Sequence, residues 1–278
     1  YWTLHDMWAF TGGCHHSGDC LNFQVACGNC QEFLKNPAKN DLSHQVWKEK
    51  VQAFQQPNLH IITCSDWLKE RAASSSILKN QTIESIPNAI NIELFKPAKK
   101  EDAKKSLGLD PEKKHILFVA MRVNAPKKGF IYLEQALKAL DKSTHELIVV
   151  GNAQELPELH LNAHHLGHIS STEKMIQIYQ AADVYVTPSL EENLPNTIME
   201  ALACGTPCVG FNIGGIPEMI EHQVNGYVAQ YQSSEDLTAG LMWTLANAPD
   251  SAARNKAATS YSEEIIAAKH VNYYAHVG

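Results

Sequence analysis

The feature that most constrains the fold is an alternation of short β-rich runs and amphipathic helical runs that begins near residue 59. The apolar runs "KHILFVAMR" at 114–122 and "HELIVVG" at 145–151 have the length and the β-branched content of buried strands. Between them, "GFIYLEQALKAL" at 129–140 places apolar residues at helical spacing. Strands that alternate with helices of this length predict βαβ units, and therefore an α/β fold with a parallel sheet. By the same criteria we expect strands at 58–65, 183–189 and 206–211, and helices at 66–73, 171–182, 195–205, 214–222 and within 251–276.

The segment "SIPNAINIELFKPAKK" at 85–100 is the expected boundary between two domains. It contains two prolines and no clear periodicity, and a new series of strands and helices follows it. A chain of 278 residues is long enough for two small domains. We therefore predict a first domain at 1–90 with a cysteine-rich loop at 11–31, a second domain at 91–255, and a C-terminal helix at 256–278.

The charge balance limits the classes of ligand. A net charge of −7, from 23 basic and 30 acidic residues, argues against a nucleic-acid-binding protein and against a strongly cationic membrane patch. The lysine-rich piece 96–114 is most simply a solvated helix and loop, with a weak peripheral membrane contact as the alternative. No apolar run approaches the roughly 20 residues of a membrane span. Seven cysteines in an α/β pattern favour a reducing compartment, so we expect a cytoplasmic protein, with the inner face of the membrane as a further location.

The stretch "TPSLEENLPNTIMEALACG", residues 187–205, contains three glutamates, of which Glu192 and Glu200 lie around the start of one predicted helix. One interpretation is purely structural: Thr197-x-x-Glu200 matches a capping box, which leaves Glu192 as a loop charge. The other is a ligand site, because Glu192 would follow a strand of a parallel sheet, and ligands bind at the carboxyl ends of such strands. Free amides at a helix start hold phosphate, and carboxylates accept hydrogen bonds from hydroxyls. A sugar nucleotide, with hydroxyls on both sides of a diphosphate, has this layout.

A positive charge for such a diphosphate is present in "AMRVNAPKKGF" at 120–130, after another predicted strand. Arg122 can bind a phosphate through two parallel hydrogen bonds, and Lys128 acts as a point charge. The alternative is a pair of surface cations in a loop.

These motifs resemble those of the GT-B glycosyltransferases, specifically the retaining family 4 group. The segment "SLEENLPNTIMEALACGTPCVGFNIGGIPEMIEHQVNGYV" resembles that family's E-x7-E region, and "MRVNAPKKG" resembles its diphosphate-binding loop. Likewise, "SIPNAINIELFKP" resembles its interdomain linker, and "YWTLHDMW" resembles the strand that ends in an active-site His-Asp. The resemblance implies a GT-B fold, in which two Rossmann-like domains with parallel sheets face a cleft. Because the chain begins without Met, in a strand-like run, we expect its first domain to be incomplete at the N-terminus.

The resemblance also implies roles for residues near the reacting bond. His5 would line the donor-sugar and acceptor side of the cleft, and Glu192 would contact hydroxyls of the donor sugar. Arg122 and Lys128 would stabilise the departing diphosphate. The reaction implied is transfer of a hexosyl unit from a nucleoside diphosphate sugar to an acceptor hydroxyl with retention, without a catalytic metal. The acceptor would be a glycan or a lipid-linked glycan, in polysaccharide or glycoconjugate biosynthesis.

A second group of residues would bind the rest of the donor. Glu200 would hold the nucleotide ribose, and the amides of Leu194, Asn196 and Thr197 would approach the phosphates. The family often has glycines at this point, whereas this chain has Pro195, which carries no N–H to donate.

The loop "FTGGCHHSGDCLNFQVACGNC" arranges Cys14, Cys20, Cys27 and Cys30 as C-x5-C-x6-C-x2-C. The second half has the spacing of a zinc knuckle, and the first half is wider than usual. A structural zinc is therefore one interpretation, with His15 or His16 able to replace one thiolate. The alternative is four reduced thiols in a glycine-rich loop.

Three other functions compete with glycosyl transfer. A GT-B-shaped sugar-nucleotide epimerase would need further acid and base groups, which the sequence does not offer beyond His5 and Glu192. A dinucleotide-dependent oxidoreductase would carry G-x-G-x-x-G after a strand, and neither "VVGNAQ" nor "GFNIGG" fits that pattern. The third is a protein without enzymatic activity that is stabilised by a metal ion and serves as an interaction module.

Overall fold

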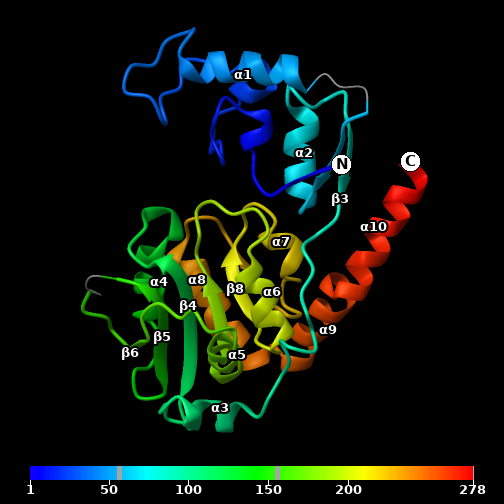
Figure 1. The fold of residues 1–278 in the computed structure, drawn as a ribbon. Coiled ribbons are helices and arrows are strands. Elements are labelled where there is room, and N and C mark those ends of the chain that lie inside the picture. Colours follow the sequence, from blue (N-terminus) through cyan, green and yellow to red (C-terminus); the bar gives the residue numbers. More distant parts are fainter. Residues whose placement is uncertain (55–57, 154–156, 278) are drawn as a thin grey trace. The chain divides into compact units, whose positions relative to one another are not determined.

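The computed structural model describes residues 1–54, 58–153 and 157–277, and the chain divides into two compact units (Figure 1). Unit 1 is Tyr1–Pro87 and unit 2 is Asn88–Gly278, so unit 2 starts inside the proline-containing segment 85–100. Gly278, the last residue of the expected C-terminal helix, lies outside the described residues. In the described part of the chain, no helix combines the length and the hydropathy that crossing a bilayer requires.

Unit 1 contains a three-stranded parallel sheet in the order β1-β2-β3. Its core joins the sheet to the cysteine-rich loop, because Phe10 and Phe23 are buried with Ile61 and Leu68. The strand and helix predicted around residue 65 are confirmed, and the Ser65 side chain accepts a hydrogen bond from the amide of Leu68, 3.0 Å away, at the helix start. The elements are β1 (Trp2–Leu4), η1 (Trp8–Phe10), η2 (Asn22–Gln24), α1 (Leu42–Ala53), β2 (His60–Thr63), α2 (Asp66–Ser74) and β3 (Thr82–Ser85).

Unit 2 contains a six-stranded sheet in the order β6-β5-β4-β7-β8-β9, and every pair of neighbours is parallel. The predicted α/β architecture is therefore correct. The elements are α3 (Lys100–Ser106), β4 (Lys114–Arg122), η3 (Pro126–Lys128), α4 (Phe130–Leu137), β5 (His145–Asn152), β6 (Asn162–His165), α5 (Thr172–Ala181), β7 (Val184–Thr187), α6 (Asn196–Ala203), β8 (Cys208–Phe211), α7 (Ile216–Met219), β9 (Gly226–Ala229), α8 (Ser234–Asn247), α9 (Asp250–Tyr261) and α10 (Glu263–Val277).

Both faces of this sheet are covered, which explains why its strands are apolar on both sides. On one face, Leu133 of α4 and Leu241 of α8 pack with Phe118 and Val149 of the central strands. Helices α5 and α6 lie on the other face, as Figure 1 shows. Helix α9 packs against α6, and its Arg254 donates to the carbonyl oxygens of Phe95 and Ala203, so the C-terminal helices belong to unit 2.

The strand order reverses next to β4, and this reversal positions the site. The chain proceeds from β4 outward to β5 and β6, then returns to the other side of β4 and proceeds outward through β7, β8 and β9. The loops that follow β4 and β7 therefore begin at neighbouring strands, and the chain then continues in opposite directions along the sheet. In open α/β sheets such a switch point opens the crevice in which ligands bind.

One sequence expectation for unit 2 is wrong. The lysine-rich piece 96–114 is not solvated throughout, because Lys104 is buried and pairs with Asp183 at 2.8 Å. Asp183 also accepts from Lys114 of β4, 3.4 Å away, so this carboxylate links α3, through Lys104, to the amino ends of the sheet.

Candidate functional site

The loop after β4 brings two predicted cations to the switch point. Arg122 is the last residue of β4, and Lys128 is the last residue of the 3-10 helix η3. Gly129 follows with φ of 65°, and a Cβ there would lie 1.9 Å from the carbonyl oxygen of Pro188. Only glycine allows this close approach, which presses the loop after β4 against the loop after β7.

Polar contacts join the same two loops. The ammonium of Lys128 forms an ion pair with the carboxylate of Glu192. Next to it, Lys127 pairs with Glu191 at 2.7 Å, and the amide of Leu190 donates to the carbonyl oxygen of Lys127 at 2.8 Å. The structure therefore brings Lys128 and Glu192 together, although they lie 64 positions apart in the sequence.

Arg122 lies beside this pair in the sequence of the loop but is not part of it. Its side chain is exposed, and the guanidinium makes no hydrogen bond or ion pair with any residue in the described ranges. An exposed guanidinium at the end of a central strand is available to an anionic ligand without the loss of an internal contact.

A third loop packs against the backbone of Glu192, and the sequence assigns it no role. The amide of Gly215 donates to the carbonyl oxygen of Asn193 at 2.6 Å. Gly214 has φ of 58°, and a Cβ there would lie 1.8 Å from the carbonyl oxygen of Glu192. The available signal is the Gly-Gly pair in "FNIGGIP", because paired glycines mark a backbone that must pass close to another chain segment.

Glu200 is not part of a capping box, so the structural interpretation of this residue is wrong. Helix α6 begins at Asn196 with Pro195 as N-cap, and no side chain caps its amides. Thr197 is thus already helical, and its hydroxyl oxygen accepts a hydrogen bond from Tyr185 at 2.8 Å. Glu200 accepts a hydrogen bond from the hydroxyl of buried Tyr179, also at 2.8 Å. Burial raises the pKa of Glu200, although the Tyr179 hydroxyl opposes this shift.

The start of α6 leaves backbone donors available. Among the described residues, no acceptor is found for the amides of Leu194, Asn196 and Thr197. The Asn196 side chain, in contrast, accepts a hydrogen bond from Asn88 at 3.0 Å. Unpaired amides at a helix N-terminus attract anions, which is the property that the sequence predicts for these three residues.

His5 belongs to unit 1, where it directly follows β1 and is exposed. Its neighbour Asp6 accepts hydrogen bonds from the amide of Trp8 and from Nδ1 of His15, each at 2.7 Å. Asp6 thus fixes the turn in which His5 lies and joins it to the cysteine-rich loop.

The four cysteines of the loop are free thiols. Burial raises the pKa of Cys27 to about 11, and the amide of Gly12 donates to its sulfur at 3.1 Å. Burial also raises the pKa of Cys14, and charge on the neighbouring cysteines raises it further. Within the described residues, however, no three of these sulfur atoms come within 4.8 Å of one another, so the loop as it stands is not a closed metal site.

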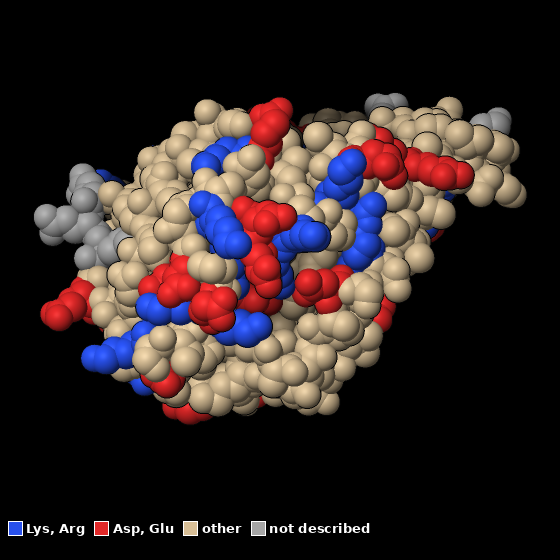
Figure 2. All heavy atoms as spheres, turned by 90° about the horizontal axis from the view of Figure 1, so that it is seen from below, with Lys and Arg blue, Asp and Glu red and all other residues tan. Residues whose placement is uncertain are grey.

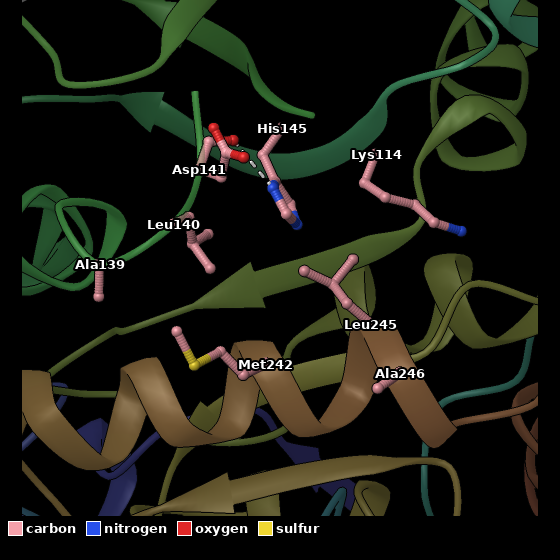
Figure 3. A pocket seen from close by; sticks show the side chains of 8 residues that line it. All are labelled: Lys114, Ala139, Leu140, Asp141, His145, Met242, Leu245 and Ala246. Carbon is pink, nitrogen blue, oxygen red and sulfur yellow. Dashed lines mark hydrogen bonds between the residues drawn. The ribbon is translucent and has the colours of Figure 1, made fainter. Parts of the chain in front are cut away.

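A separate hollow lies away from the predicted residues (Figure 3). Its volume is about 430 Å³, and it is lined by Lys114 and His145 at the amino ends of β4 and β5 and by Met242 and Leu245 of α8. Because ligands of parallel sheets bind at the carboxyl ends of strands, we do not assign this hollow to the predicted site. The face seen in Figure 2 carries interspersed basic and acidic side chains.

Comparison with known proteins identifies the part of the chain that carries this geometry. Residues 113–247 match the family model of the glycosyl transferases group 1. An uncharacterized glycosyltransferase of Methanocaldococcus jannaschii is 29% identical over 233 residues, which cover 77% of this chain and 59% of that protein. The N,N'-diacetylbacillosaminyl-diphospho-undecaprenol alpha-1,3-N-acetylgalactosaminyltransferase of Campylobacter jejuni is 28% identical, over 68% of this chain and 52% of that protein. The chain therefore spans less than two thirds of the length of these relatives.

Solved structures show the same fold. Sucrose-phosphate synthase from Thermosynechococcus elongatus superimposes with a TM-score of 0.73 at 21% identity, over 99% of this chain and 67% of that one. Anabaena HepE in complex with UDP and glucose gives a TM-score of 0.65 at 21% identity, over 83% of this chain and 67% of that one. The likeness confirms the predicted GT-B class of α/β fold. Residues 113–247 are thus similar in sequence to the glycosyl transferases group 1 domain, and the solved structures add the fold.

Proposed function

We propose that this protein is a retaining glycosyltransferase that moves a hexosyl unit from a nucleoside diphosphate sugar to an acceptor hydroxyl. The observation that carries the proposal is the meeting of Lys128 and Glu192 at the switch point of the sheet, with Arg122 at the end of β4, where the loop of Lys128 begins. A cation for the diphosphate and a carboxylate for sugar hydroxyls then lie next to each other, in the order in which a sugar nucleotide presents these groups.

The chemistry follows from where charge develops. Cleavage of the bond between the sugar and the diphosphate gives the sugar oxocarbenium character and leaves negative charge on the departing oxygen. Lys128 and Arg122 would stabilise that oxygen, and the amides of Leu194, Asn196 and Thr197 would hold the phosphates. Glu192 would bind sugar hydroxyls, and Glu200 would bind the ribose. His5 would act on the donor-sugar and acceptor side.

The relatives suggest the substrates. HepE is described in complex with UDP-glucose, so we propose a uridine diphosphate hexose as donor. The Campylobacter relative is named for a diphospho-undecaprenol acceptor, so we propose a lipid-linked glycan as acceptor. All seven cysteines are free thiols, which agrees with a cytoplasmic location, and a lipid-linked acceptor would bring the protein to the inner face of the membrane.

Calorimetric titration tests the donor site. We expect UDP to bind more tightly than GDP, ADP or NAD, and we expect Glu200→Gln to weaken binding by about 10- to 100-fold, since a hydrogen bond to a charged group contributes roughly 1.5–3 kcal/mol. Binding of NAD alone would refute glycosyl transfer. Retention is tested separately, by the anomeric configuration of the glycoside formed from an α-linked donor.

We also propose a structural zinc held by Cys14, Cys20, Cys27 and Cys30. Gly28 and Asn29 both have positive φ, which turns the chain sharply between the last two cysteines. The loop would close around the ion by inward movement of the exposed Cys20. Zinc would then stabilise unit 1 and take no part in the reaction, because four protein ligands leave no open position. Metal analysis of the purified chain should find more zinc in the parent than in a Cys27→Ser/Cys30→Ser variant, and equal zinc contents would refute the site.

A further inference from the structure

Three metal-binding side chains from neighbouring strands meet at the end of the unit 2 sheet opposite the proposed donor site. His115 is in β4, Glu146 is in β5 and His164 is in β6. In the sheet register His115 pairs with Glu146, and His164 lies two positions beyond Asn162, the partner of Glu146. Because side chains two positions apart in a strand point to the same face, all three lie on one face of the sheet.

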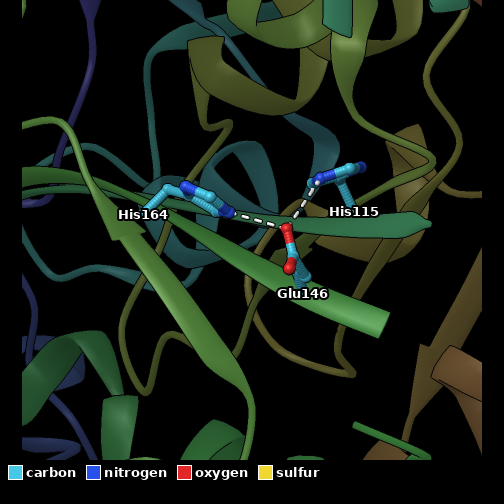
Figure 4. A group of neighbouring side chains, drawn as sticks. All are labelled: His115, Glu146 and His164. Carbon is cyan, nitrogen blue, oxygen red and sulfur yellow. Dashed lines mark hydrogen bonds and ion pairs between the residues drawn. The ribbon is translucent and has the colours of Figure 1, made fainter. Parts of the chain in front are cut away.

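The three ligand atoms converge on one point (Figure 4). Nε2 of His164 lies 2.7 Å from Oε2 of Glu146, and Nε2 of His115 lies 3.4 Å from the same oxygen. One ligand atom from each residue falls within 4.8 Å of the other two, and no second group of this kind occurs in residues 1–54, 58–153 and 157–277.

The environment of the His115 ring is not explained by an ordinary cluster of ion pairs. Its side chain has 0% exposure, yet neither ring nitrogen has a hydrogen-bond partner. A buried imidazole nitrogen without a hydrogen bond costs free energy.

The other carboxylate oxygen is already held in place. Oε1 of Glu146 accepts hydrogen bonds from Lys113 at 2.7 Å and from Asn162 at 3.0 Å. These contacts orient the carboxylate and leave Oε2 directed at the two imidazoles. Hydrogen bonds of this kind around a ligating carboxylate are a regular property of metal sites.

We propose that His115, Glu146 and His164 bind a divalent transition metal, with zinc as the ion that suits two imidazoles and one carboxylate. His164 is 27% exposed, so the ion can enter from solvent and keep a water as fourth ligand. The site lies seven residues before Arg122 in β4, which is roughly 23 Å along the strand. The metal therefore joins β4, β5 and β6 and takes no part in glycosyl transfer.

The test is a titration of the full chain with Zn²⁺ and with Co²⁺, compared among three proteins. The matched variants are His164→Ala, which removes a ligand, and His165→Ala, which removes the exposed neighbouring histidine on the same strand. We expect His164→Ala to weaken zinc binding at this site by at least about 100-fold, and we expect His165→Ala to leave it unchanged. Glu146→Gln provides a second ligand variant.

Cobalt distinguishes this site from the cysteine loop. Co²⁺ bound to histidine and carboxylate gives visible d–d bands without the near-ultraviolet charge-transfer band that thiolate ligands produce. We expect such bands in a Cys27→Ser/Cys30→Ser chain, and we expect His164→Ala to abolish them in that background. The proposal is overturned if that background chain binds no cobalt or zinc, or if His164→Ala and His165→Ala bind the metals equally well when each is added to that background.

Discussion

Lys128 and Glu192 form an ion pair across the switch point, between the loop after β4 and the loop after β7. The Lys128 side chain is 37% exposed and that of Glu192 is 16% exposed, so the pair lies at the surface with its carboxylate largely covered. A diphosphate that binds Lys128 would compete with Glu192 for the ammonium and would leave the carboxylate free to accept sugar hydroxyls. Donor binding would thus convert an internal contact into two contacts with the substrate.

The two adjacent lysines provide a matched test of this relationship. We expect Lys128→Ala to slow turnover through a loss of about 2–4 kcal/mol of transition-state stabilisation, because the substitution removes a positioned charge from the leaving group. Lys127 pairs with Glu191 in the same way but is 54% exposed, so Lys127→Ala should remove no more than about 1 kcal/mol of transition-state stabilisation. Steady-state kinetics with a uridine diphosphate hexose measures both. Equal effects of the two substitutions would contradict the role given to Lys128.

The raised pKa of Glu200 predicts a conflict between stability and binding. Because burial raises the folded-state pKa of Glu200 above its unfolded value, the folded chain binds more protons in this range, and the free energy of unfolding falls as pH rises from about 4.3 through the folded pKa. Glu200→Gln removes this penalty and keeps an acceptor for Tyr179. We therefore expect the variant to melt at a higher temperature than the parent at pH 7 and at nearly the same temperature at pH 4.

The same substitution should weaken binding of the nucleoside diphosphate, since the amide cannot provide a charged acceptor for the ribose. In the parent chain, binding should weaken as pH falls through the pKa of Glu200, and Glu200→Gln should lack this pH dependence. Thermal melts and calorimetry at pH 4, 5, 6 and 7 measure both effects. A variant that is less stable than the parent at pH 7 would show that the buried carboxylate does not destabilise the folded chain.

Gly214 should be essential for the position of Glu192. A Cβ at Gly214 would lie 1.8 Å from the carbonyl oxygen of Glu192, so Gly214→Ala must displace that loop. We expect a loss of roughly 2–4 kcal/mol in stability together with weaker donor binding. Gly108→Ala is the control, because Gly108 also has positive φ, at +71°, but a Cβ there would meet no atom within 4 Å; it should cost about 1 kcal/mol and leave binding intact. Denaturant unfolding and calorimetry separate the two outcomes.

The buried pair of Lys104 and Asp183 predicts a purely structural effect. Lys104→Met removes the cation 2.8 Å from a buried carboxylate and should destabilise the chain by about 3 kcal/mol. This is the lower end of the usual range, because Lys100 and Lys114 still lie within 3.7 Å and 3.4 Å of Asp183. The exposed Lys105 gives the control Lys105→Met, which should change stability by less than about 0.5 kcal/mol. A similar loss in both variants would indicate an effect of helix propensity.

Local pattern predicts the elements that bury apolar residues at a regular period. The strand predicted at 114–122 has the limits of β4, and α7 lies within the helix predicted at 214–222. The edge strand β6 is not predicted, because "NAHH" carries no apolar alternation and becomes a strand only through its pairing with β5. Helix α1 is also missed, since its sequence has few apolar residues and its start depends on Asp41, whose side chain accepts from the amide of His44.

The sequence by itself determined the α/β class and suggested the residue types of the proposed donor site, because period and motif are properties of neighbouring residues. It did not determine which loops meet. The reversal of strand order beside β4 places Lys128 against Glu192, and it depends on how six strands share one sheet. Tertiary packing also gives Glu200 a hydrogen bond from Tyr179, where local spacing suggests a capping box. It brings His115, Glu146 and His164 to one point. Contacts between residues far apart in the chain are decided by packing, which no local pattern encodes.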